Sequence, residues 1–390
     1  MGLGAWLPLL GITLSAFIFN TSEFMPIALL TDMAADLGVT ESVAGIVIAV
    51  YAWSVMVLSL PLMMFASRFP LKRVLLCVIC VFLAGQAVTV LSGSYAMLVT
   101  GRVVVAAAHA VFWSIASPIA VRLVPQKFTS LALGMVVTGS SVATIVGMPL
   151  GRIVGLALGW RSAFLVVAAI TAVVLVYLTC VFPKMPAGEP FTVAKLPVML
   201  SNRALVGIYV FIAVLVTGYY TTYSYIEPFL LQVGGLEAGT VTAMLTVFGV
   251  AGIVGSFVYA RFFDGHRARF FRAAVGALLV ALLALGVASC SPVLVIADFL
   301  LWGVASTSFN VSFQGEVIRI TSQDESAVAT SIYSGIFNLG IGAGSALGGV
   351  VVSGLGVGSV GYAGAALVLV AFVFLNAWLL PQLTSAKTRE

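Results

Sequence analysis

Residues 7–30 read LPLLGITLSAFIFNTSEFMPIALL. This run is long enough to cross a bilayer, which takes about 20 apolar residues in a helix. The polar string Asn20-Thr21-Ser22-Glu23 nevertheless lies inside it. A charged side chain at that depth costs at least about 2.5–3.5 kcal/mol. Glu23 is therefore predicted to have a function. The alternative is a structural hydrogen bond to a neighbouring helix.

The rest of the chain has the same apolar character. Of its 390 residues, 62% are hydrophobic and 8% are charged, with a mean hydropathy of +1.18. Soluble domains carry roughly 25% charged residues. The composition therefore predicts a multi-pass helical membrane protein. Because a basic n-region and a small-residue cleavage site are missing, we expect no cleavable signal peptide. With only two histidines and no catalytic set, we expect no enzyme. The net charge of +5 comes from Lys and Arg in short loops, so the expected partner is the lipid bilayer and not nucleic acid.

Twelve apolar segments have the length of a membrane helix, which predicts an all-α fold with twelve transmembrane helices. The predicted spans are 7–31, 42–66, 73–92, 97–121, 131–156, 161–182, 204–231, 238–262, 270–289, 293–316, 327–353 and 358–380.

One long polar stretch, from Pro183 to Arg203, divides these spans into two sets of six. We predict an N-terminal six-helix bundle at 1–183, a cytoplasmic linker at 184–203 and a C-terminal six-helix bundle at 204–390. Glu23 is followed by Pro26 in the first span, and Glu227 is followed by Pro228 in the seventh. This weak similarity suggests duplication with pseudo-two-fold symmetry. In repeated transporter folds, the substrate site lies near the midplane between the repeats.

The basic residues also predict orientation. Fifteen of the eighteen Lys and Arg residues fall in one set of loops or in the C-terminal tail, and the three others are Arg102, Arg152 and Arg161. Because cytoplasmic loops carry the excess of Lys and Arg, both termini are predicted to be cytoplasmic.

The fourth span carries Arg102, His109 and Trp113 at helical spacing on one face. At 1.5 Å per residue, Glu23 falls between the depths of Arg102 and His109 and could pair with either. Two alternatives remain open. Arg102 could extend towards the outer headgroups, and His109 could be a hydrogen-bonded packing residue.

Three later spans carry further polar groups. In the seventh, Tyr220, Tyr223 and Glu227 share a face, and rings with a polar handle suit sugars and other amphipathic solutes. The alternative, an interfacial aromatic belt, would account for Tyr225 and Glu227. Asn310, Gln314, Ser334 and Asn338 in the tenth and eleventh spans fit cavity lining or helix–helix contact equally well.

Two acidic residues in the tenth span have simpler interpretations. Asp298 is expected at a water-accessible position. Glu316 is expected in an interfacial ion pair with Arg319.

Gly147, Gly151 and Gly155 repeat every four residues in the fifth span, with Pro149 between them. Such a row lets two helices approach closely, and the proline favours a bend. Cys77 and Cys80 form a CxxC pair within an apolar run. We expect packing there, and no metal site or cofactor.

The two sets of six spans resemble the major facilitator superfamily. The string Gly147-Met148-Pro149-Leu150-Gly151-Arg152 resembles the antiporter motif of its drug/proton antiporter branch, although Met148 separates a Gly and a Pro that are usually adjacent. More narrowly, four strings resemble the bacterial sugar efflux transporters. They are residues 16–24, 108–114, 223–229 and 334–344.

This resemblance implies a monomeric antiporter in the bacterial inner membrane that uses protons to export sugars, such as arabinose, and sugar analogues. Alternatives are efflux of drugs or other small amphipathic solutes, and a sugar facilitator or symporter. The proton-coupling candidates are Glu23, His109, Arg102 and Glu227. The substrate-binding candidates are Asn20, Glu23, His109, Trp113, Tyr220, Tyr223, Asn310, Gln314, Ser334 and Asn338, and the motif residues are Gly147, Pro149 and Gly151.

Overall fold

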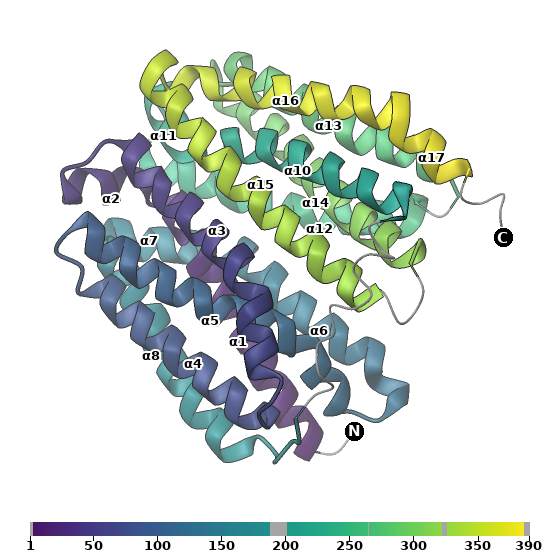
Figure 1. Cartoon of the computed structure of the whole chain (residues 1–390). Coiled ribbons are helices and arrows are strands. Elements are labelled where there is room, and N and C mark those ends of the chain that lie inside the picture. The colour runs from purple at the N-terminus through teal and green to yellow at the C-terminus, as the bar shows by residue number, and fades with distance from the viewer. Residues whose placement is uncertain (1–2, 188–200, 264, 322–325, 386–390) are drawn as a thin grey trace. The chain divides into compact units, whose positions relative to one another are not determined.

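The computed structural model describes residues 3–187, 201–263, 265–321 and 326–385, and every regular element in these ranges is a helix (Figure 1). Twelve helical segments of the described chain are long and apolar enough to cross a membrane, and each overlaps a predicted span. The predicted all-α membrane fold is therefore confirmed. The linker expected at 184–203 falls mostly at residues 188–200, outside the described residues.

The helices pack into two compact units. Unit 1 comprises Met1–Thr40 and Val50–Phe191, and unit 2 comprises Glu41–Ala49 and Thr192–Glu390. In chain order, the helices from the N-terminus to residue 181 are α1 (Leu3–Ala28), α2 (Leu30–Leu37), α3 (Glu41–Ala66), α4 (Leu71–Val90), α5 (Tyr95–Arg122), η1 (Gln126–Phe128), α6 (Thr129–Val142), η2 (Ala143–Gly147), α7 (Met148–Leu158) and α8 (Trp160–Val181). The helices that follow are α10 (Arg203–Tyr223), α11 (Ile226–Gln232), α12 (Ala238–Phe262), α13 (Arg267–Ala288), α14 (Pro292–Arg319), α15 (Ser326–Leu355), η4 (Val357–Ser359), α16 (Val360–Phe374), η5 (Leu375–Leu379) and α17 (Leu380–Ser385).

Glycine rows bring helices together in the same way in both units. In unit 1, a Cβ on Gly147 would overlap the side chain of Thr21, and one on Gly151 would lie 2.6 Å from Cε of Met25. In unit 2, a Cβ on Gly348 would lie 2.7 Å from the carbonyl oxygen of Thr221. The fifth span of each unit thus packs its small residues against the first, as small-xxx-small rows permit. This shared packing agrees with the duplication suggested by the sequence.

The fifth span contains the irregularity expected near its proline. Its backbone makes one π-helical turn, η2, directly before Met148 and Pro149. Proline has no backbone N–H to donate, so a local change in hydrogen-bond register is an ordinary way to accommodate it inside a span.

The first helix of each unit is interrupted near its end. α1 gives way to α2 at Leu29, and α10 gives way to α11 at Ser224 and Tyr225. Pro228 cannot donate to the carbonyl of Ser224, which favours the second break. The prediction that Glu227 shares a helical face with Tyr220 and Tyr223 is therefore wrong, because Glu227 belongs to a separate helix.

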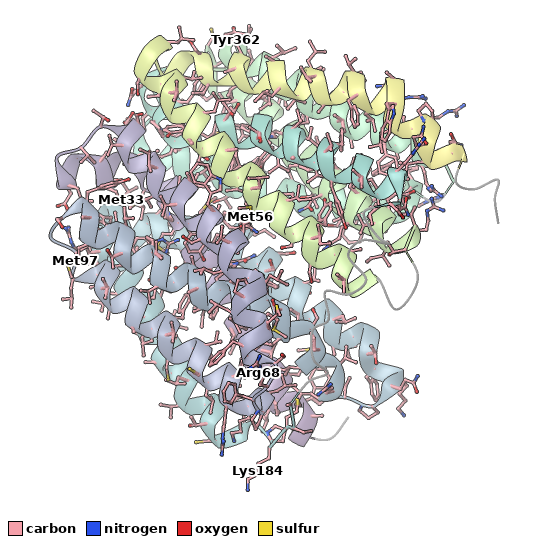
Figure 2. The ribbon with its side chains drawn as sticks, viewed as in Figure 1. Met33, Met56, Arg68, Met97, Lys184 and Tyr362 are labelled. Atoms are coloured by element: carbon pink, nitrogen blue, oxygen red, sulfur yellow. The ribbon has the colours of Figure 1, made fainter. Side chains whose placement is uncertain are left out.

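Side chains fill the space between the helices (Figure 2). At one end of unit 1 lie Arg68 and Lys184, and at the opposite end lie Met33 and Met97 (Figure 2). This gathering of basic loop residues is the asymmetry from which orientation was predicted.

Candidate functional site

Glu23 lies in a polar cluster inside unit 1, formed by residues of α1, α3, α4 and α5. Its side chain is 12% exposed, and one carboxylate oxygen, Oε2, lies 3.7 Å from Nε2 of His109. On the other side of the imidazole, Nδ1 lies 2.8 Å from the hydroxyl of Tyr51. Carboxylate, imidazole and phenol thus form a chain of three groups that can each hold or release a proton. His109 contacts titratable groups at both of its ring nitrogens.

Arg102 contributes a buried positive charge to the same cluster. Its side chain is 1% exposed. It donates to the hydroxyl of Ser22 at 3.0 Å and to the main-chain carbonyl of Glu23 at 3.5 Å. The guanidinium also lies 4.4 Å from the centre of the Tyr51 ring, a cation–π contact that is strongest where water is excluded. The alternative in which Arg102 extends towards outer headgroups is therefore wrong.

The sequence analysis did not place Tyr51, Ser22 or Gln86 at the site. The amide of Gln86 donates to the hydroxyl of Ser22 at 2.5 Å, so Ser22 joins Gln86 to Arg102. Gln86 is fully buried in α4. An isolated amide in the middle of an apolar span was the signal that could have identified it.

Two further candidates of unit 1 lie near this cluster. Asn20 is buried and donates to the hydroxyl of Ser140 on α6. Trp113 is partly exposed, and its ring centre lies 6.0 Å from that of His109. Trp113 is thus available for stacking, whereas Asn20 already has a helix–helix contact.

In unit 2, the tyrosines of α10 belong to a buried aromatic cluster. Tyr223 packs between Tyr219 and Phe248, with ring centres 5.2 Å apart on each side, and Trp302 of α14 lies 5.9 Å away. Tyr220 contacts Tyr219 and Phe337. Both Tyr220 and Tyr223 are 4% exposed.

The polar candidates of α14 and α15 have different environments. Gln314 and Ser334 are exposed, Asn310 is partly exposed and Asn338 is buried. Asn310 accepts weak hydrogen bonds from the hydroxyl of Tyr333, and Asn338 donates to the carbonyl of Ser334. Asn310 therefore takes part in a helix–helix contact, whereas the side chains of Gln314 and Ser334 are accessible to a ligand.

The structure corrects three expectations for acidic residues and their neighbours in unit 2. Glu227 and Tyr225 are fully buried, so neither belongs to an interfacial belt. Tyr225 donates to the carbonyl of Ser345. Asp298 is 6% exposed and therefore does not occupy a water-accessible position. Glu316 binds Arg319 as expected, but it is fully buried and also binds Arg267.

The string that resembles the antiporter motif, and the turn that follows it, make specific packing contacts. Gly147 in η2 and Gly151 in α7 lie against α1, and Arg152 of α7 donates to the carbonyl of Ala28. At the end of α7, Gly159 has a φ of +84°, which a residue with a Cβ rarely adopts. The chain therefore turns directly into α8.

The residues after this turn anchor α2. Trp160 and Arg161 both donate to the carboxylate of Asp36. Arg161 also donates to the carbonyl of Ser92, which follows α4.

No cluster that could hold a metal ion occurs among the described His, Cys, Asp and Glu residues. Cys77 and Cys80 are free and exposed on α4. The titratable side chains of the unit 1 cluster can transfer protons and make hydrogen bonds.

Comparison with known proteins decides the family. The model of the Major Facilitator Superfamily matches residues 12–315 and 235–390. The chain belongs to the major facilitator superfamily. Its members are transporters, which confirms that this protein is not an enzyme.

Two relatives align with nearly the whole length of this chain. A "Probable sugar efflux transporter" of Helicobacter pylori (strain ATCC 700392 / 26695) is 38% identical over 364 residues, which is 93% of each chain. One from Mannheimia succiniciproducens is 37% identical, over 92% of this chain and 90% of the relative.

Solved structures of two other transporters share the fold. A bacterial homologue of the human lysosomal transporter Spinster, inward-facing and unoccupied, has a TM-score of 0.75 at 15% identity and covers 100% of this chain and 98% of its own. The peptide transporter POT in complex with sulfate has a TM-score of 0.76 at 14% identity and covers 97% and 95%. At these identities the likeness concerns the fold alone.

Proposed function

We propose that this transporter is a proton-coupled antiporter that exports sugars and sugar analogues from the bacterial cytoplasm by alternating access. The observation that carries the proposal is the contact of Glu23 with His109, and of His109 with Tyr51, inside a membrane-spanning unit. Sugar is the proposed substrate because the curated relatives are called probable sugar efflux transporters. The inner membrane, the cytoplasmic termini and a monomeric state complete the proposal.

Glu23 is the proposed proton carrier. Burial disfavours the charged form of a carboxylate, whereas the fixed charge of Arg102 favours it. Opposing influences of this kind let a carboxylate change protonation within the transport cycle. In an exporter, substrate would bind when Glu23 is deprotonated and leave when a proton enters from outside. Binding of the two ligands would then be reciprocally linked.

Sugar recognition is assigned to aromatic and amide side chains in each unit. In unit 1, the partly exposed ring of Trp113 can stack on the apolar face of a sugar ring, as aromatic rings do with apolar surfaces. In unit 2, we assign this role to Tyr220 and Tyr223, with hydrogen bonds from Gln314 and Ser334. Both rings are 4% exposed in an aromatic cluster and would have to leave it to contact the sugar. Asn20, Asn310 and Asn338 have protein partners and would have to exchange them to bind substrate.

The test uses proteoliposomes that contain wild-type protein or Glu23→Gln, with labelled arabinose as the probe. Glu23→Gln imitates the protonated state, so it should lose accumulation driven by a pH gradient while it retains sugar exchange without one. Glu237→Gln, an exposed position before α12, is the matched control and should behave as wild type. Accumulation by Glu23→Gln against the sugar gradient would reject Glu23 as the carrier.

The same vesicles distinguish the alternatives. Wild-type protein that equilibrates arabinose but never concentrates it is a facilitator. Protein that moves sugar in the direction of the proton is a symporter. Protein that concentrates amphipathic dyes and not arabinose belongs with the drug antiporters.

A further inference from the structure

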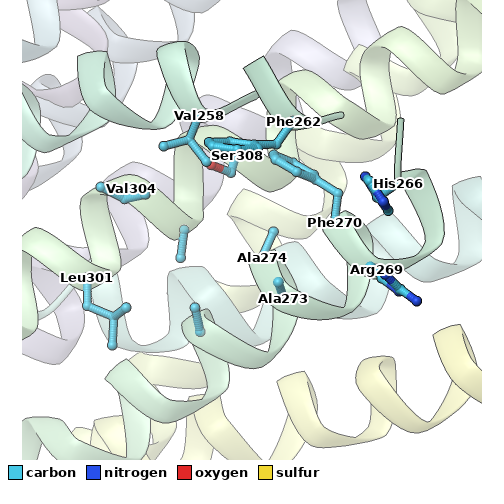
Figure 3. Close-up of a pocket in the computed structure, with 12 residues that line it drawn as sticks. Val258, Phe262, His266, Arg269, Phe270, Ala273, Ala274, Leu301, Val304 and Ser308 are labelled. Carbon is cyan, nitrogen blue, oxygen red and sulfur yellow. The ribbon is translucent and has the colours of Figure 1, made fainter. Parts of the chain in front are cut away.

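An apolar groove of about 520 Å³ lies between α12, α13 and α14 in unit 2 (Figure 3). Small residues, among them Ala273, Ala277 and Ala305, line part of it, together with Phe262 and Leu301. Phe262 is 56% exposed and Leu301 is 38% exposed. The groove is therefore open at the surface of three membrane-spanning helices, where lipid is the solvent.

One end of the groove carries positive charge. His266 and Arg269 lie together there, while Leu301 and Val304 lie at the other end (Figure 3). This charged end is formed by the start of α13, whose N-cap is His266 and whose first turn contains no acidic residue. The first amides of a helix have no partner within it and favour a negative charge nearby.

Arg269 differs from the two other arginines at the start of α13. Arg267 binds the buried carboxylate of Glu316, and Arg272 donates to the side chain of Asn376. Against the described residues, Arg269 makes no hydrogen bond or ion pair, and it is exposed at the mouth of the groove. Arg269 is thus a fixed charge at the end of the groove that no described residue pairs.

We propose that this groove binds an anionic phospholipid, with one acyl chain against the alanines and the phosphate at Arg269 and His266. The apolar lining fits a hydrocarbon chain, and the charged end fits a phosphodiester. Basic pockets between transmembrane helices on the cytoplasmic side are a recognised form of headgroup site. The α12–α13 loop is predicted to be on that side. The proposal does not depend on which solute is transported.

The experiment measures binding of phosphatidylglycerol and phosphatidylcholine, with matched acyl chains, to delipidated full-length protein by native mass spectrometry. Wild type should prefer phosphatidylglycerol, and Arg269→Gln should weaken its binding about fivefold, the effect of one cation near the surface. Arg73→Gln is the matched control, because Arg73 is the third residue of α4 as Arg269 is of α13, and it should change nothing.

Filling the groove separates a specific site from general attraction of anionic lipid. Ala277→Phe should weaken binding of both lipids while Arg269 is still present. If that variant is not monodisperse, Ala273→Leu at an exposed groove position replaces it. Equal binding of the two lipids by wild type, or equal losses in Arg269→Gln and Arg73→Gln, would overturn the proposal. Retained binding in the filled groove would also overturn it.

Discussion

Nε2 of His109 lies 3.7 Å from the carboxylate of Glu23. At this separation, the imidazole contacts the carboxylate without the short, aligned geometry of a strong hydrogen bond. A modest movement of α1 or α5 would therefore tighten or break the contact. This sensitivity to movement is suited to a group that must change partners as the transporter changes conformation.

His109→Gln should uncouple sugar movement from the pH gradient. The amide can still donate a hydrogen bond, but it cannot take up a proton. Accumulation driven by the gradient should fall strongly, because the variant has no titratable group between Glu23 and Tyr51. Exchange without a gradient should persist. Ser114→Ala on the same helix removes only a bond to the carbonyl of Ala110 and serves as the control. Equal accumulation by His109→Gln and wild type would leave His109 with a packing role.

Trp113→Ala and Tyr220→Ala should each weaken sugar binding by roughly three- to tenfold, since aromatic contacts contribute about 0.5–1.5 kcal/mol beyond burial. Binding of arabinose to purified protein can be measured by calorimetry. Trp53→Ala, at an exposed position of α3, should bind as wild type does. If both variants bind arabinose as tightly as wild type, the two rings have only a packing role.

Gly147→Ala should destabilise the protein by about 1–3 kcal/mol, the usual cost of overpacking, because its Cβ would overlap Thr21. Gly134→Ala is the matched control in the same span. Nothing lies within 4 Å of a Cβ there, and alanine is the better helix former by about 1 kcal/mol. Thermal unfolding of both variants in one detergent measures the difference. The packing argument fails if Gly147→Ala melts no lower than Gly134→Ala.

The spans were predictable because apolar length alone defines a membrane helix. The contact of Glu23 with His109 could be predicted from the sequence. Polar side chains are costly in the bilayer, so two of them at similar depth tend to pair. Tyr51 could not be placed in the same way. A single tyrosine in an apolar span gives no periodic signal, and its role depends on packing of α3 against α5.

The burial of Glu227 and Tyr225 was missed for a related reason. From its position in the sequence, a residue near the end of a span is expected at the membrane–water interface. The chain instead breaks at Ser224, where Ser224 and Tyr225 both bind Ser345 of α15. These are tertiary contacts between residues far apart in the sequence, and Pro228 was the only local sign of the break.

The contact between Asp36 and Arg161 should stabilise the folded protein at neutral pH but not at acid pH. Hydrogen bonding by Arg161 lowers the pKa of Asp36 below its ordinary value of 3.8. A carboxyl with a lowered pKa in the folded state adds stability above its unfolded pKa, and this is lost as pH falls through the folded pKa. Asp36→Asn should therefore melt lower than wild type at pH 7, and the difference should shrink below about pH 4.

The effect of Asp36 should be small. Its side chain is 45% exposed and that of Arg161 is 33% exposed, and exposed pairs contribute at most about 1 kcal/mol. Melting curves from pH 7 to pH 3 measure the difference between the two proteins. A difference that grows on acidification would contradict the assigned role.

Glu316 should be the most sensitive ion-pair position of unit 2. Its fully buried carboxylate joins Arg267 at the start of α13, at 2.9 Å, to Arg319 at the end of α14, at 2.6 Å. Removal of one partner from a fully buried pair typically costs about 3–5 kcal/mol. The cost here should be lower, because Arg267 is 17% exposed and Arg319 is 35% exposed. Glu316→Gln should therefore lower the midpoint of thermal unfolding by roughly 5–10 °C. Arg272→Gln on α13 loses only an exposed bond to Asn376 and should lower it far less. Equal melting of the two variants would mean that Arg267 and Arg319 reach solvent or lipid headgroups without Glu316.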